Sequence, residues 1–156
     1  MNNKFLIERK IFYFKIILLS IYVIFLSFWI LDIVVFGTKQ YDGLTPSTFD
    51  EKIRKFLTIK IFVFVFNYLV IIFYLFNLIF VKNKGFGYFF AILWLILFAA
   101  IFTSNLINKD FYDNTFRLVL IIVMNLILAI IVLTFIYFVF KIYQLKMLNK
   151  VIKYKL

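Results

Sequence analysis

The sequence predicts an all-α integral membrane protein: a bundle of four transmembrane helices with a basic amphipathic C-terminal extension. Four long apolar runs, residues 11–36, 57–81, 86–107 and 116–143, take up most of the 156-residue chain. Each is long enough for the roughly 20 residues with which an α-helix crosses about 30 Å of hydrocarbon. Hydrophobic residues make up 66% of the chain, more than a soluble domain of this size can bury. We therefore expect a single transmembrane domain with residues 144–156 as its tail.

The first run predicts a retained membrane helix. It is too long for the hydrophobic region of a signal peptide, and no small-residue cleavage site follows it. Asp32 lies about one turn before its outer end. An acid at this depth is costly to bury and is a candidate for function or for an ion pair.

The second run is preceded by a capping box at residues 48–51, which predicts that its helix begins before the membrane. Along the helix, Lys60, Asn67 and Tyr74 are seven residues apart and form a polar stripe, with Asn77 nearby. We expect this stripe to face protein, because an amide exposed to lipid lacks hydrogen-bond partners. Lys60 lies at a depth similar to that of Asp32, which predicts a salt bridge between them. A separate stripe of bulky apolar residues faces lipid or another protein; it consists of Phe62, Phe66, Leu69, Phe73, Phe76 and Phe80.

The third run follows a link of only four residues, 82–85, which predicts that the second and third helices are antiparallel neighbours. It also contains pairs of residues that have small side chains and lie four positions apart, a pattern that allows close helix packing. These pairs are Gly87 with Ala91, Ala99 with Thr103, and Ala100 with Ser104.

The fourth run is expected to be capped by Asp113 or Asn114. Asn125 is expected at a depth in the membrane close to that of Asn67, which predicts a hydrogen bond between these two amides. Beyond the run, lysines recur at helical spacing and predict a surface helix that binds anionic lipid headgroups or an acidic partner. The residues of this basic tail are Lys141, Lys146, Lys150, Lys153 and Lys155.

The distribution of charge predicts the orientation. Both termini and the link at 82–85 fall on one side of the membrane, together with 11 of the 18 Lys and Arg residues but only one of the seven Asp and Glu residues. The positive-inside rule places this side in the cytoplasm. We expect a multi-pass protein of the cell membrane, or of an organelle inner membrane if the gene is organelle-encoded. The abundance of Phe, Ile, Lys, Asn and Tyr indicates an AT-rich genome.

The sequence contains few residues that would support catalysis. The chain has no His and no Cys, and it carries no core carboxylate pair, metal-binding cluster or phosphate-binding Gly loop. All four Gly lie near expected helix ends or in loops, so broken helices of the transporter type are not expected. The net charge of +11 is explained by topology and lipid headgroups, without a nucleic-acid partner. No enzymatic activity and no cofactor are predicted.

These observations favour a non-catalytic accessory or scaffold subunit of a larger membrane protein complex, in contact with other subunits and with anionic lipid. The main alternative is a small-solute or ion permease that acts as an oligomer. A holin-like or immunity protein is a third possibility. The candidate polar and packing residues inside the membrane are Asp32, Lys60, Asn67, Tyr74, Asn77, Asn125 and Ser104.

Overall fold

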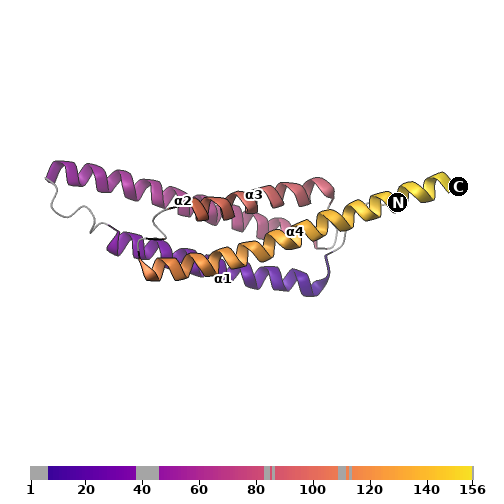
Figure 1. Cartoon of the computed structure of the whole chain (residues 1–156), viewed down its shortest axis with the longest axis horizontal. Helices are drawn as coiled ribbons and strands as arrows, with labels where there is room; N and C mark the ends of the chain where they lie inside the picture. The colour runs from indigo at the N-terminus through magenta and orange to yellow at the C-terminus, as the bar shows by residue number, and fades with distance from the viewer. Residues whose placement is uncertain are drawn as a thin grey trace.

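A computed structural model describes residues 7–37, 46–82, 85, 87–108, 112 and 114–155, apart from the side chains of 46–49, 149 and 151–155. Four α-helices account for nearly all of these residues (Figure 1). Each is long and apolar enough to cross a membrane, in agreement with the predicted four-helix transmembrane architecture. In chain order they are α1 (Arg9–Phe36), α2 (Pro46–Val81), α3 (Tyr88–Ile107) and α4 (Thr115–Lys155).

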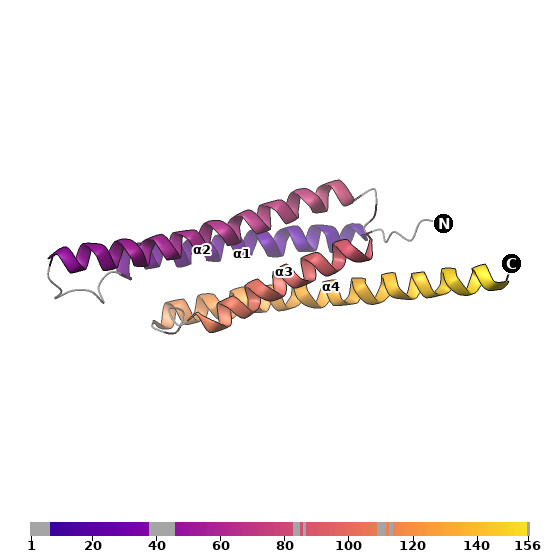
Figure 2. The same cartoon turned by 90° about the horizontal axis from the view of Figure 1, so that it is seen from above.

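The helices form two antiparallel hairpins, α1 with α2 and α3 with α4, which lie one beside the other (Figure 2). Helix α3 packs most closely against α4, and α1 packs against both α2 and α4. The short link makes α2 and α3 antiparallel, as predicted, but these two helices are not among the closely packed pairs.

Two helices are longer than their apolar runs. Helix α2 begins at Pro46, eleven residues before the run at 57–81, and α4 extends to Lys155, twelve residues past the run that ends at 143. Their 36 and 41 residues correspond to about 54 and 62 Å, well beyond about 30 Å of hydrocarbon. Proline suits the start of α2, since the first turn of a helix needs no N–H donor. Both helices project beyond the rest of the bundle, at opposite ends (Figures 1 and 2).

Helix α1 has one buried face, whose residues recur in alternating steps of three and four. This is the spacing of a helix that packs lengthwise in an antiparallel bundle. The buried positions include apolar and aromatic residues together with two ionisable ones; they are Phe12, Lys15, Leu19, Tyr22, Leu26, Trp29, Asp32 and Ile33.

Specific residues define the helix ends. The Asn114 side chain accepts a hydrogen bond from the Phe116 N–H at 3.2 Å, so Asn114 caps α4 as predicted. The Tyr112 hydroxyl donates to the Leu106 carbonyl at the end of α3, at 3.1 Å. After α2, Gly85 has a φ of 67°, and its N–H donates to the Val81 carbonyl at 2.9 Å. Glycine takes this left-handed conformation without the steric cost of a Cβ atom.

Several polar side chains bond their own helix instead of a neighbour. The hydroxyls of Ser20, Ser27 and Thr103 each donate to the carbonyl four residues earlier, at 2.8–2.9 Å. Inside the bilayer no water is available as a hydrogen-bond partner, and such a bond satisfies the hydroxyl within its own helix. Ser20 and Thr103 are exposed on the bundle surface, so these small polar residues are compatible with lipid and need no partner helix.

Candidate functional site

The first buried polar site is an ion pair between α1 and α4. The Arg117 guanidinium donates to an Asp32 carboxylate oxygen, and both side chains are only 8% exposed. Asp32 therefore pairs with Arg117, in place of the predicted Lys60. Because α4 begins at Thr115, Arg117 lies in its first turn and reaches the level of Asp32 across the α1–α4 contact. Its planar, always charged guanidinium suits a buried carboxylate better than an ammonium does.

Lys60 belongs to a different environment. It is partly exposed on α2, and its Nζ lies 5.4 Å from the centre of the Phe56 ring, one turn earlier on the same helix. This arrangement is a local cation–π contact near the start of the membrane-spanning part of α2.

The second polar site ties three helices together. The Asn105 amide of α3 donates to the Tyr22 hydroxyl of α1 and to the Asn125 amide oxygen of α4, both at 3.4 Å. The hydrogen bond of Asn125 is thus made with Asn105, in place of the predicted Asn67. Helices α2 and α4 are not among the closely packed pairs of the bundle, and Asn67 lines a pocket against α3.

Asn67 faces α3 instead. It is 6% exposed and lines a pocket of about 260 Å³ between α2 and α3, opposite Ala100 and Ser104. No hydrogen bond of the Asn67 amide is found among the described residues. The spacing of Ala100 and Ser104 predicted tight packing, but both residues are exposed and border a hollow, since α2 and α3 are not among the closely packed pairs.

Asn77 takes no part in this pocket. Its amide donates to the Phe73 carbonyl of its own helix at 2.8 Å. Of the predicted polar stripe on α2, Asn67 and Tyr74 are buried against protein, as expected, while Lys60 and Asn77 are only partly buried.

The third site is built around Lys15, whose side chain is fully buried. Its Nζ donates to the Tyr74 hydroxyl at 3.2 Å and lies 3.7 Å and 4.5 Å from the ring centres of Phe135 and Phe138. No carboxylate contacts Lys15 among the described residues. The positive charge is therefore held by aromatic faces and one hydroxyl, which is the chemistry of a cation–π cage.

All four helices meet at this cage. The Tyr74 ring packs edge-on against Trp94 and Phe98 of α3, with ring centres 4.9 and 5.1 Å apart, and against Phe135 of α4 at 5.6 Å. Such edge-to-face pairs add specific attraction to the burial of apolar area. We call the group of Lys15, Tyr74, Trp94, Phe98, Phe135 and Phe138 the Lys15 cage.

Part of the basic tail is described. Lys141, Lys146 and Lys150 are exposed on α4, and the Lys141 Nζ lies 5.8 Å from the Tyr137 ring centre. Lys146 and Lys150 line a groove together with Tyr88 of α3. The side chains of Lys153 and Lys155 lie outside the described residues. The lipid or partner contact of the tail stays a prediction.

Sequence reasoning missed Lys15 and Arg117, because both were counted only in the distribution of charge that predicts the orientation. A signal for Lys15 was present, since Lys15, Tyr22 and Trp29 are seven residues apart, as are Lys60, Asn67 and Tyr74. A lysine in the register of two aromatic residues indicates a position on the packed face. Arg117 carried no such signal, since its burial depends on where α4 begins relative to α1.

The three sites join helices to one another. Among the described residues, no group of three or more His, Cys, Asp or Glu side chains is placed to hold a metal ion. The buried polar groups that do meet are an ion pair, an amide–phenol network and a caged ammonium. Comparison of the chain with protein-family models, with curated proteins and with solved structures finds no match.

Proposed function

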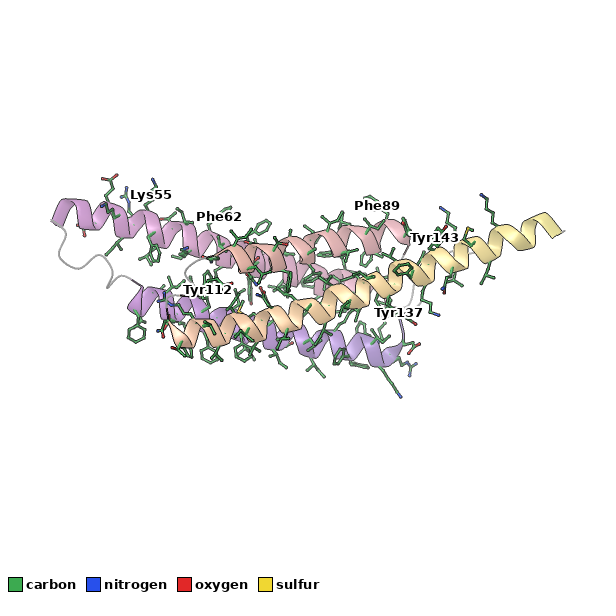
Figure 3. The ribbon with its side chains drawn as sticks, in the orientation of Figure 1. Lys55, Phe62, Phe89, Tyr112, Tyr137 and Tyr143 are labelled. Carbon is green, nitrogen blue, oxygen red and sulfur yellow. The ribbon has the colours of Figure 1, made fainter. Side chains whose placement is uncertain are left out.

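We propose that this chain is a non-catalytic accessory or scaffold subunit of a larger membrane protein complex. The observation that carries the proposal is the surface of α2, the helix with the smallest buried share. Its stripe of six bulky residues points outward, with Phe62, Phe73 and Phe80 among the most exposed side chains, and Figure 3 shows Phe62 on the outer side of the helix. The stripe is suited to a transmembrane helix of a partner subunit.

The stripe continues into a charged segment. Before the apolar run, α2 carries exposed charges of both signs, at Asp50, Glu51, Lys52, Arg54 and Lys55. This segment lies on the part of α2 that projects beyond the bundle (Figure 1). Mixed charge favours a protein surface over a lipid headgroup layer, since headgroups attract mainly cations. One helix thus offers an apolar contact inside the membrane and a polar contact outside it.

The interior favours a scaffold over a conduit. Apart from Asn67, the buried charged and amide side chains are bonded to other side chains of the chain, and aromatic rings of the Lys15 cage fill the centre of the bundle near one end. For the orientation, we propose that both termini lie in the cytoplasm, from the excess of Lys and Arg on that side. An AT-rich bacterium, or an organelle genome, is the proposed source.

Purification of the tagged chain from its native membrane in mild detergent, with cross-linking mass spectrometry, tests the subunit role. We expect stoichiometric partners cross-linked through Lys52 or Lys55. Phe66→Leu with Phe73→Leu should lose these partners, since the stripe loses its aromatic faces. A matched control, Phe28→Leu with Phe140→Leu, alters phenylalanines of similar exposure on α1 and α4 (50% and 63%, against 52% and 68%).

The control variant should retain the partners, and removal of residues 146–156 should weaken their recovery if the basic tail is a second contact. Recovery of wild-type protein alone, or only as a homo-oligomer, would overturn the subunit proposal.

A permease is the second candidate, and the pocket of Asn67 and Ser104 favours it. A buried amide with no hydrogen bond among the described residues, facing a hollow of about 260 Å³, is the type of group that binds a polar solute. In liposomes that contain this protein alone, Asn67→Leu should then abolish flux, while Asn77→Leu should leave it intact. Absence of flux through folded wild-type protein would exclude this function.

A further inference from the structure

A groove of about 380 Å³ lies between the start of α3 and the projecting part of α4. Both segments lie at the end of the bundle where α1 begins (Figure 2). Helix α3 contributes Tyr88, its first residue, and α4 contributes Tyr143, Lys146, Met147 and Lys150. The α4 residues are spaced by three, one and three, so they share one face of the helix. The groove is therefore formed by two helices rather than by the basic tail alone.

The two lysines on this face are one turn apart. Like charges at this spacing repel each other weakly unless an anion lies between them. Neither ammonium has an ion-pair partner among the described residues. The two tyrosine hydroxyls add donors to the same groove.

The start of α3 adds a third source of positive potential. Its N-cap residue is Gly87, whose lack of a capping side chain leaves the first N–H groups of the helix open. A Cβ atom placed at Gly87 would meet nothing within 4 Å, so this helix end is sterically free. The N-terminal end of a helix attracts anions.

The remaining surroundings are apolar. Tyr88, Tyr143 and Met147 are 43%, 52% and 48% exposed, and the next residue of α3, Phe89, is 79% exposed. Figure 3 shows Phe89 and Tyr143 at the same end of the bundle. Tyrosines at this level are typical of the membrane–water interface, with hydrocarbon on one side and headgroups on the other.

From this juxtaposition, we infer that the groove binds the headgroup of one anionic phospholipid. The phosphate lies between the Lys146 and Lys150 ammonium groups, the tyrosine hydroxyls donate to its oxygens, and the acyl chains follow the apolar surface beside Phe89. An inorganic anion would use only the charged part of this surface. A phospholipid would use both the charged part and the apolar part.

Native mass spectrometry of the purified full chain, titrated with dioleoyl phosphatidylglycerol, dioleoyl phosphatidylcholine or inorganic phosphate, tests the inference. We expect one phosphatidylglycerol per chain, at concentrations where phosphatidylcholine does not bind and phosphate does not compete. Lys146→Gln with Lys150→Gln should weaken binding about 25-fold, at about 5-fold for each lysine near an anionic headgroup. The matched control, Lys52→Gln with Lys55→Gln, makes the same change of charge at the opposite end of the bundle and should leave the affinity unchanged.

Tyr88→Ala separates the groove from simple adsorption of the basic tail, because Tyr88 belongs to α3. It should weaken phosphatidylglycerol binding while circular dichroism and gel filtration stay unchanged. Equal binding of phosphatidylcholine, an equal loss in the Lys52/Lys55 control, or full binding by the Tyr88→Ala variant would each overturn the inference. Displacement of the lipid by inorganic phosphate would assign the groove to a soluble anion instead.

Discussion

Asp32 of α1 and Arg117 of α4 form a buried ion pair that joins the first and last helices of the bundle. Asp32 lies four residues before the end of α1, and Arg117 lies two residues after the start of α4. The pair therefore connects these helices near the end opposite the Lys15 cage. The two sites are separated along α1 by about 26 Å, from the rise of 1.5 Å per residue.

Removal of the charge of either Asp32 or Arg117 should lower the stability of the fold. We expect Asp32→Asn or Arg117→Gln to lower the free energy of unfolding by about 3–5 kcal/mol, because each leaves the other charge buried without its partner. The apolar double variant Asp32→Leu/Arg117→Met should recover most of the loss. Trp29, one turn from Asp32 and buried, reports unfolding by its fluorescence in detergent titrations. Single variants as stable as the wild type would show that the pair contributes nothing.

The Lys15 cage predicts an unusual response to loss of charge. Lys15→Met keeps the length of the side chain and removes an ammonium with no carboxylate partner among the described residues. We expect its free energy of unfolding to be unchanged or raised. Lys15→Ala should be about 2–5 kcal/mol less stable than Lys15→Met, because it leaves a cavity. Thermal unfolding, followed by the fluorescence of Trp94 in a Trp29→Phe background, compares them. A Met variant less stable than the Ala variant would contradict this account.

The two buried asparagines, Asn105 and Asn67, should differ in their contribution to the stability of the bundle. Asn105→Leu removes the hydrogen bonds that join α3 to α1 and α4, and we expect a cost of about 0.6–2 kcal/mol. Asn67→Leu should be neutral or stabilising, because the Asn67 amide makes no hydrogen bond among the described residues and leucine places an apolar side chain among the apolar residues of this pocket. Denaturant titration of both variants measures the difference. An equal cost at both positions would show that Asn67 has a partner.

The link after α2 depends on one glycine. Gly85→Ala places a Cβ at a φ of 67°, and we expect a loss of about 1–2 kcal/mol. Gly87→Ser is the matched control two residues later, where the space is open and serine is a better N-cap in general; stability should be kept or increased. Thermal unfolding of the two variants distinguishes these effects. A neutral Gly85→Ala variant would mean that the link adjusts without strain.

The predicted orientation can be tested directly, since the chain has no cysteine. Lys52→Cys and Lys146→Cys each introduce the only thiol, on exposed parts of α2 and α4. In intact cells, a membrane-impermeant maleimide should label position 52 and should label position 146 only after the membrane is opened. The reverse pattern would place both termini outside and contradict the positive-inside rule for this chain.

The sequence predicted the four helices well because each apolar run is a local property. Length and hydropathy are sufficient for a membrane span, since every backbone N–H and C=O of a helix is satisfied within the helix itself. The cap of α4 at Asn114 and the inward position of Asn67 and Tyr74 were predicted for the same reason, from neighbouring residues and helical periodicity. Hydropathy does not resolve the charged segments at the ends of the apolar runs; the early start of α2 was predicted instead from the capping pattern at residues 48–51.

The tertiary structure alone decided which buried groups meet. Asp32 was predicted to bond Lys60 on the next helix, and Asn67 was predicted to bond Asn125 at a similar depth; Arg117 and Asn105 provide the observed partners of Asp32 and Asn125. Depth in the membrane can be counted along the chain. Which helices lie side by side cannot be counted in this way, because in lipid an apolar helix gains little free energy from one neighbouring helix over another. Their arrangement depends on side-chain fit across helices that are distant in sequence, and this fit buries Lys15 among rings from α2 and α4.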